Sequence, residues 1–350
     1  MRIYSLKYLS AYTLPLTVLA ACYFKGWITF LPLVYSFGII PLIELVVKPN
    51  ARNLSELEAS LAAKDKVYDW LLYLTVPIQW CFVFYYLHLI TDPHLMVYEK
   101  VGLTTSLGIL CGIFGINVGH ELGHRKNKWE QLLAKVLLLS SLYMHFFIEH
   151  NRGHHKRVST PADPASAQIG ESLYLFWIKS LIFSYLSACT IESERLRKMQ
   201  YPWFSWRNEM IWYQLIQVTL VATIIYIFGW EAGLYFISAA VIGMLLLETV
   251  NYIEHYGLSR RINSNGRYEK VAPNHSWNSN HVIGRMILFE LSRHSDHHYK
   301  ASKKYQILEH HDNSPQMPTG YPGMMLLALV PPVWFRLMHP KINQVLSQAS

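Results

Sequence analysis

Histidines at metal-binding spacings are the chemical feature of this sequence, which carries 17 histidines among 350 residues. On a helix, residues three or four positions apart share one face, so their imidazoles can reach a common metal ion. Three clusters have this spacing, and a further histidine, His255, follows an apolar run. The clustered histidines are His120 and His124, then His150, His154 and His155, then His294, His297 and His298. We predict that all nine are metal ligands.

Nine imidazoles exceed the shell of one ion, because a transition metal takes about six ligands in an octahedral geometry. The sequence therefore predicts two metal ions. In a regular α-helix, His150 and His154 would share a face and His155 would lie one step round. The three histidines of the last cluster would lie on one side of their helix.

Acidic residues beside the clusters are candidates for orienting the ligands. A metal-bound imidazole usually donates its second N–H to a carboxylate, a carbonyl or water. The carboxylates predicted for this role are Glu121, Glu149, Asp163, Glu254 and Asp296.

Three other interpretations stay open at this point. A single histidine at a helix end often caps the helix or packs against a neighbour. His120 to His124 also matches the HExxH pattern of zinc peptidases, with Glu121 as general base, but such an enzyme would leave the remaining clusters unused. A histidine-rich metal transporter would need ionisable residues along a path across the bilayer.

Composition places the chain in a membrane. It is 52% hydrophobic and 15% charged, whereas a soluble domain is about 25% charged. We expect an all-α integral membrane protein whose residues 1–350 form one domain. A span needs about 20 apolar residues. Six spans, in three antiparallel hairpins, are predicted at about residues 9–24, 27–47, 70–90, 101–118, 211–228 and 234–250.

Two apolar segments near these spans have alternative interpretations. Leu19-Ala20-Ala21-Cys22 resembles the cleavage box of a lipoprotein signal peptide, but a second apolar run follows at once, which favours a retained first helix. Residues 131–148 are apolar but interrupted by Lys135, which favours a helix packed against the bundle or the interface.

The positive charges set the orientation. With both termini inside, the outer segments hold only Lys25 and Lys100, and the other 29 of the 31 Lys and Arg residues lie inside. This is the positive-inside pattern, so residues 119–210 and 251–340, which carry the metal-site segments, are predicted to be cytoplasmic. The basic residues form no dense stripe, so the net charge of +8 does not indicate nucleic-acid binding. The four cysteines form no CxxC pair, so no cysteine metal site is expected.

Longer strings around the histidines resemble the integral-membrane alkane 1-monooxygenases, within the membrane-bound desaturase and hydroxylase superfamily. The resemblance runs from about Pro41 to Pro340. The strings are His120–Arg125 (HELGHR), Glu149–His155 (EHNRGHH), Asn251–Leu258 (NYIEHYGL), Gly266–Glu269 (GRYE), His275–His281 (HSWNSNH), Arg293–His298 (RHSDHH) and Pro318–Gly323 (PTGYPG). Xylene monooxygenase subunits resemble the intervening strings less well, and desaturases share little beyond the histidine spacing.

The resemblance implies a non-haem di-iron enzyme of the bacterial inner membrane. It would use O₂ to hydroxylate the terminal methyl of medium- or long-chain alkanes. Electrons would come from an acidic rubredoxin and its NAD(P)H-dependent reductase, and Arg125, Lys126 and Lys128 are candidates for the dock. His275 and His281 would support the ligands, while His310 and His311 are expected at the surface. An aryl methyl or a fatty acyl chain stays open as an alternative substrate.

An alkane offers no polar group to bind, so an apolar channel between the helices is expected. Each buried methylene would contribute about 0.8 kcal/mol. Tyr35, Ser36 and Phe37 on the second predicted span are candidates for lining this channel and for limiting chain length.

Overall fold

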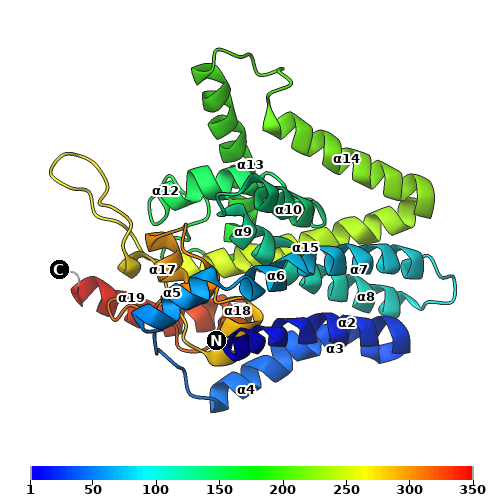
Figure 1. Ribbon diagram of the computed structural model, residues 1–350, viewed down its shortest axis with the longest axis horizontal. Helices are drawn as coiled ribbons and strands as arrows, with labels where there is room; N and C mark the ends of the chain where they lie inside the picture. The colour runs from blue at the N-terminus through cyan, green and yellow to red at the C-terminus, as the bar shows by residue number, and fades with distance from the viewer. Residues whose placement is uncertain (1, 349–350) are drawn as a thin grey trace.

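The computed structural model describes residues 2–348, and in this part of the chain it is built from helices, with only two isolated β-bridges (Figure 1). The α-helices are α1 (Arg2–Ser5), α2 (Thr13–Phe24), α3 (Leu31–Val34), α4 (Ile40–Val46), α5 (Glu56–Lys64), α6 (Val67–Tyr73), α7 (Thr75–Ile90), α8 (Val97–Leu110), α9 (Val118–Gly123), α10 (Lys128–Leu139), α11 (Phe146–Glu149), α12 (His155–Arg157), α13 (Leu173–Lys198), α14 (Glu209–Phe228), α15 (Trp230–His255), α16 (Val282–Ile287), α17 (His294–Tyr299), α18 (Tyr321–Ala328) and α19 (Pro331–Gln348).

Shorter segments of other helix types join several of these helices. The 3₁₀ segments are η1 (Leu6–Tyr12), η2 (Gly26–Phe30), η6 (Pro273–His275) and η7 (Tyr305–Ile307). The π-helical segments are η3 (Tyr35–Ile39), η4 (Cys111–Asn117) and η5 (His150–His154). The predicted all-α integral membrane fold is confirmed.

Within the described residues, six helical segments are long and apolar enough to cross a membrane. They are Gly26–Val46, Val67–Ile90, Val97–Gly123, Leu173–Lys198, Glu209–Phe228 and Trp230–His255. Five coincide with predicted spans. The predicted span at residues 9–24 is helical as η1 and α2 but is absent from this set, because its apolar run is short and is preceded by Lys7 and Tyr8.

Helix α13 was not predicted as an apolar helix of this length. Lys179 and several serines interrupt its apolar run and make it look like part of a polar segment. The helix brings Ser180, Ser184 and Glu192 onto one buried face, because residues four apart lie above one another. The exposed apolar residues of α13 therefore lie on the rest of its surface.

The turns of the hairpins are bound to one another at the end away from the histidines, on the right in Figure 1. Lys25 forms an ion pair with Asp92 at 2.8 Å, and the Gly26 amide donates to Glu99 at 2.7 Å. Lys100 forms an ion pair with Glu231 at 2.8 Å. These contacts hold the three connections at a common level.

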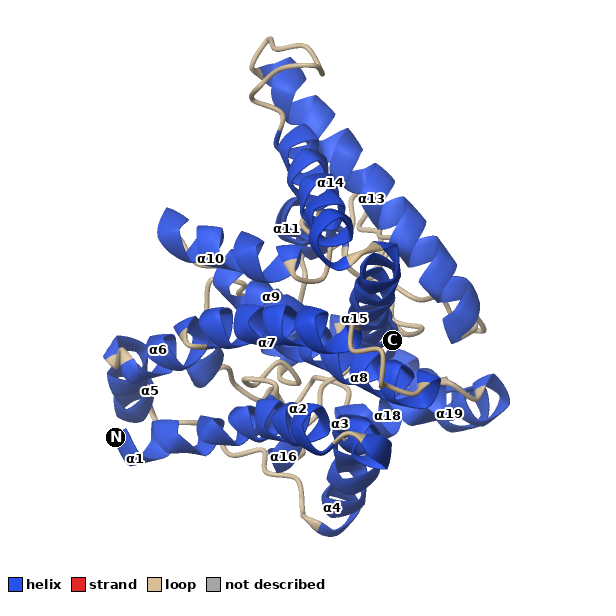
Figure 2. Ribbon diagram, turned by 90° about the vertical axis from the view of Figure 1, so that its right-hand side faces the viewer, coloured by secondary structure: helices blue, strands red, loops and turns tan. Residues whose placement is uncertain are grey.

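Segments far apart in sequence meet at the opposite end of the bundle. The Tyr8 hydroxyl donates to Glu290 at 2.7 Å, and the Asn50 amide donates to the Asn280 carbonyl at 2.9 Å. Near α15, Trp334 of α19 packs on Tyr252 and Tyr256. Both ends of the described chain therefore support the end that carries the histidines, toward the left of Figure 1, and Figure 2 views the bundle from the opposite end.

Residues 131–148 do not form one helix. Helix α10 ends at Leu139, and a turn containing Leu142 with a positive φ of 51° redirects the chain into α11. Leu133 and Leu137 of α10 are buried, and α10 packs against α9. The predicted packing against the bundle is confirmed.

Buried Glu290 joins the N-terminal helix to the segment before α17. Its carboxylate accepts from Arg285 at 2.6 Å and forms an ion pair with Lys7 at 3.1 Å. Burial alone would raise the pKa of Glu290, but Arg285, Lys7 and Arg293 lower it from 4.5 to about 2. The stabilisation is therefore complete above pH 4.5 and is lost as the pH falls toward 2.

Glu290→Gln should lower the free energy of unfolding in detergent by about 3 kcal/mol, because it leaves buried cations without their carboxylate. The difference from the wild type should shrink as the pH falls from 4.5 to 2. Glu309→Gln is the control, since its ion pair with Lys303 is at the surface and should contribute less than about 1 kcal/mol. A pH-independent difference would contradict this assignment.

Candidate metal centre

The nine predicted histidines lie together, and the structure divides them into two groups that could each hold a metal ion. The ligand atoms of each group lie within 4.8 Å of one another. We call them the five-histidine group (His120, His124, His150, His155 and His297) and the four-histidine group (His154, His255, His294 and His298).

Short nitrogen-to-nitrogen distances run through the five-histidine group. Nε2 of His120 lies 2.9 Å from Nε2 of His297, and Nε2 of His150 lies 3.1 Å from Nε2 of His124 and 3.0 Å from Nε2 of His155. Ligands at right angles around a metal with bonds of about 2.1 Å lie about 3.0 Å apart. The spacing therefore fits neighbouring ligands of one ion.

The second histidine cluster departs from the predicted α-helical arrangement. His150 to His154 form π-helical η5, in which backbone hydrogen bonds join residues five apart and each turn is wider than in an α-helix. His150 and His155 consequently point into the five-histidine group, while His154 points into the other. The rings of His150 and His154 lie 5.1 Å apart between centroids, as residues on one face would, yet they belong to different groups.

Helix α17 also supplies both groups. His297 belongs to the five-histidine group, whereas His294 and His298 belong to the four-histidine group. The three rings lie 4.4 to 5.7 Å from one another between centroids, as rings on one side of the helix would, but they are shared between the two groups. Since α17 lies between the two groups, one short helix contributes ligands to both.

Several imidazole nitrogens in the four-histidine group are buried without a partner. They are Nε2 of His154, Nδ1 of His294 and both nitrogens of His298. A buried polar atom left without a partner costs about 1–3 kcal/mol. Burial and neighbouring imidazoles also lower the pKa of His155 and His298 well below the ordinary value, which favours the neutral form that binds metals. The residues present therefore fit a metal ion.

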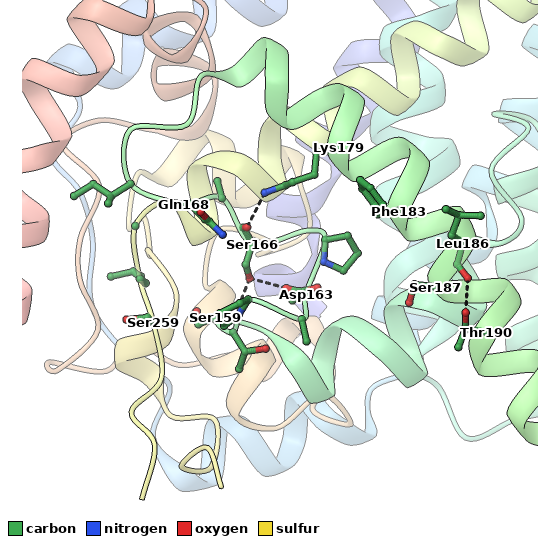
Figure 3. Close-up of a pocket in the computed structure, with 18 residues that line it drawn as sticks. Ser159, Asp163, Ser166, Gln168, Lys179, Phe183, Leu186, Ser187, Thr190 and Ser259 are labelled. Atoms are coloured by element: carbon green, nitrogen blue, oxygen red, sulfur yellow. Dashed lines mark hydrogen bonds between the residues drawn. The ribbon is translucent and has the colours of Figure 1, made fainter. Parts of the chain in front are cut away.

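Asp163 holds His154 in position. The Nδ1 proton of His154 is donated to the Asp163 carboxylate at 2.9 Å, which leaves the Nε2 lone pair facing the group. Ser166 also donates to this carboxylate at 2.6 Å. Asp163 lies at the base of an open cavity of about 680 Å³ between the residue 159–168 loop and α13 (Figure 3).

Glu254 and the Ser276 hydroxyl contact two other members of this group. An oxygen of Glu254 lies 3.1 Å from Nε2 of His294, and the second oxygen accepts from the Tyr321 hydroxyl at 2.7 Å. Nδ1 of His255 lies 3.5 Å from the Ser276 hydroxyl. The ring of His275 contacts Glu269 rather than one of the nine histidines.

The remaining candidates for orienting the ligands bind elsewhere. Glu121 binds Arg125 at 2.9 Å and the Tyr305 amide at 3.2 Å, so it does not orient an imidazole as predicted. Glu149 accepts from Arg157 and Ser187, because both lie on the side away from the rings. His281 contacts Ser279.

Asp296 and His311 also differ from prediction. Asp296 accepts from His311 at 2.8 Å and from Lys303 at 2.7 Å, rather than from one of the nine histidines. His311 was expected to be a plain surface residue, yet it is half-buried by this contact. The pair anchors the segment after α17, because Asp296 also accepts the Glu309 amide.

Sequence reasoning missed Glu248, a buried carboxylate in α15. It accepts from Tyr143 at 2.8 Å, from Ser180 and from Asn251. A charged residue inside an apolar span is a signal that could have found it. Its contacts join α13 and the turn before α11 to the helix that carries His255.

Two apolar cavities lead away from the histidines. One, of about 70 Å³, is lined by Ser36 and Phe37 together with Asn117 and Leu291, each three residues before a predicted ligand. The other, of about 260 Å³, shares Phe37 and lies between α13, α15 and α18. Tyr35 lines neither of these cavities, because its hydroxyl bonds to Thr13.

Asp163→Ala should weaken metal retention 10- to 100-fold, because His154 loses the acceptor that fixes its tautomer. The measurement is metal content by mass spectrometry after dialysis against a chelator. Glu171→Ala is the control, since Glu171 pairs with Lys179 in the same region without touching a histidine. Equal retention in both variants would contradict the role of Asp163.

Comparisons with known proteins agree with this arrangement. The fatty acid desaturase family model matches residues 100–328. An alkane 1-monooxygenase of Pseudomonas aeruginosa is 40% identical over 315 residues, covering 88% of this chain and 82% of the relative. An alkane 1-monooxygenase of Alcanivorax borkumensis is 38% identical over 310 residues, covering 88% and 81%.

A more distant relative is the hydroxylase component of a Pseudomonas putida xylene/toluene monooxygenase, 31% identical over 70% of this chain and 65% of the relative. The similarity to the alkane enzymes is higher and covers more of the chain. The resemblance seen in the histidine strings is therefore confirmed. The chain belongs to the alkane 1-monooxygenase family of membrane enzymes, within the fatty acid desaturase family.

Proposed function

We propose that this chain is a di-iron monooxygenase that hydroxylates the terminal methyl of medium- or long-chain alkanes with O₂. The observation that carries the proposal is the pair of all-histidine groups next to an apolar cavity. The alkane substrate is supported by the names of the relatives.

The nine histidines are the proposed ligands of two iron ions, five for one and four for the other. Imidazole suits several transition metals, so family membership is what favours iron. When bound, the iron pair would supply the O₂ chemistry that no side chain can perform on an unactivated C–H bond. The residues of this chain fix the geometry, exclude water and hold the second nitrogens of the ligands.

The apolar cavities are the proposed substrate path. Their lining offers an alkane the contacts that it can use, at about 0.8 kcal/mol for each buried methylene. Phe37 lines both cavities. It therefore stands where an alkane would pass from the larger cavity, which we call the outer cavity, into the smaller one, which we call the inner cavity. The inner cavity would present the chain end first, because its lining residues Asn117 and Leu291 each come three residues before a proposed ligand.

The surface above the five-histidine group is the proposed electron entry. His124 and His155 are only half-buried, and exposed Lys126, Lys128 and Lys156 lie beside them in sequence. These lysines suit an acidic rubredoxin, reduced in turn by its NAD(P)H-dependent reductase. Arg125 does not serve this dock as predicted, because it is buried in ion pairs with Glu121 and Asp69.

The proposed location is the bacterial inner membrane, with both termini and the histidines on the cytoplasmic side. The excess of Lys and Arg outside the three turns supports this orientation. A soluble reductant can reach the site only from that side.

Purified protein should contain about two irons per chain, and His297→Ala and His298→Ala should each abolish hydroxylation. These adjacent residues face different groups, so both ions are tested from one helix. His281→Ala is the control, because its ring bonds to Ser279 outside both groups. Membrane insertion should persist in all three variants. One zinc per chain, or activity in either α17 variant, would contradict the proposal.

Ser36→Trp should shorten the longest alkane accepted, because Ser36 is buried at the wall of the inner cavity. Phe37→Ala should lengthen it by joining the cavities, and Ser36→Ala should leave it unchanged. The measurement is the set of alcohols formed from a mixture of alkanes of graded length and xylenes. An unchanged profile in both Ser36→Trp and Phe37→Ala would refute the path, and products from xylenes alone would refute the alkane substrate.

A further inference from the structure

The number of membrane crossings between two contacting histidines is constrained. The rings of His154 and His255 lie 4.9 Å apart between centroids, so both are on the same side of the membrane. The chain between them contains three long apolar helices, α13, α14 and α15. Three crossings would place the two histidines on opposite sides. At least one of these helices therefore does not cross.

Helices α14 and α15 behave as a crossing hairpin. The start of α14 lies at the histidine end, where Glu209 pairs with Lys135 at 3.0 Å and with Arg152 at 3.0 Å. The turn after α14 lies at the far end, where Glu231 pairs with Lys100. Helix α15 then returns to His255. These two helices account for an even number of crossings.

Both ends of α13 stay at the histidine end. Just before its start, the Glu171 carbonyl accepts from the hydroxyl of Tyr252 at 2.7 Å, and Tyr252 lies three residues before His255. Near its end, Glu192 pairs with Arg152 of η5 and accepts the Glu209 amide at 2.7 Å. The helix has 26 residues, or about 39 Å, enough to cross if it stood upright.

The course of α13 agrees with these contacts. It runs across the direction of α7 and α8 in Figure 1. Lys179, Phe183 and Thr190, three turns of the helix, line one cavity with the loop that holds Asp163 (Figure 3). Arg157 donates to Ser187 in the middle of this stretch.

Helix α13 has two different faces. Ser180, Ser184 and Glu192 are buried against the protein. The outward stripe over the first half of the helix is apolar and exposed, and it consists of Leu175 (65%), Ile178 (61%) and Ile182 (52%). Over the second half it turns polar.

The loop after α13 carries the residues of a membrane interface. Phe204 is 89% exposed and Trp206 is 74% exposed, and Arg207 stacks over the Trp206 ring at 4.9 Å. Aromatic and basic residues gather at the headgroup level of membranes.

We propose that α13 lies in the plane of the bilayer interface on the histidine side, with its apolar stripe in the lipid and its polar face toward the metal-site segments. A helix of this kind buries its apolar face about 5–10 Å into the headgroup boundary. The inference holds whatever the enzyme's substrate.

Counting membrane crossings in the same way shows that the N-terminal segment has to cross the membrane. Tyr8 contacts Glu290 and Asn50 contacts Asn280, so residues 8 and 50 lie on the same side. Gly26–Val46 supplies one crossing between them. The segment formed by η1 and α2 must then supply the other. Among the described residues, six crossings remain, with η1 and α2 replacing α13.

Accessibility to a membrane-impermeant maleimide tests this topology. Single cysteines are introduced by Gln168→Cys, Met199→Cys or Glu231→Cys into a protein that also carries Cys81→Ala and Cys189→Ala. Each variant is labelled in right-side-out and in inverted vesicles. All three positions are exposed. The first two should react from the same side and Glu231→Cys from the other. Labelling of Gln168→Cys and Met199→Cys from opposite sides would overturn the proposal.

Depth measurements separate an in-plane helix from one that dips into the bilayer and returns. Nitroxides at Leu175, Ile178 and Ile182 should report the same shallow depth from their accessibility to O₂ and to a water-soluble nickel complex. Leu215, Val218 and Ile225 on α14 serve as the crossing control and should differ in depth. A deep minimum within α13, or full exposure of all three positions to water, would overturn the proposal. Hydroxylase activity confirms that each variant is folded.

Discussion

Nine imidazoles, seven of them buried and two half-buried, have to converge on two points, and the rest of the structure follows from this requirement. Lone pairs that converge at about 3 Å repel one another and lose their hydrogen bonds to water, so the histidine end is costly without ions. The contacts of Asp163 with His154 and of Glu254 with His294 offset part of that cost. The buried ion pairs of Glu290 then hold the N-terminal helix against the segment before α17.

The membrane helps to satisfy this requirement by restricting where segments can go. Each crossing hairpin returns the chain to the same side, so segments separated by more than 100 residues arrive at one level. The ion pairs at the far turns keep the hairpins in register. Helix α13 would add an odd crossing, and its position along the interface keeps His154 and His255 together.

Departures from regular α-helix coincide with the functional parts. The π-helical segments precede His120, contain His150 and His154, and include Ser36 and Phe37 of the apolar cavities. Such wide turns change which residues share a face, and they are often found at functional sites. In η5 this change sends neighbouring histidines to different groups, so one short segment serves both proposed ions.

The sequence alone determined the nine histidines, the expectation of two sites and the membrane setting, because residue type, ligand number and apolar length are local properties. The tertiary structure alone decided how the histidines divide, since the width of η5 and the place of α17 depend on packing. It also showed that Glu121 and Asp296 bind other partners, because a carboxylate's partner depends on which distant segment reaches it. The same reason explains why η1 and α2, which are absent from the set of long apolar helices, are proposed to cross the membrane, whereas α13, which belongs to that set, is proposed to lie along it. Hydropathy measures how apolar a helix is, whereas its direction is set by contacts at both of its ends.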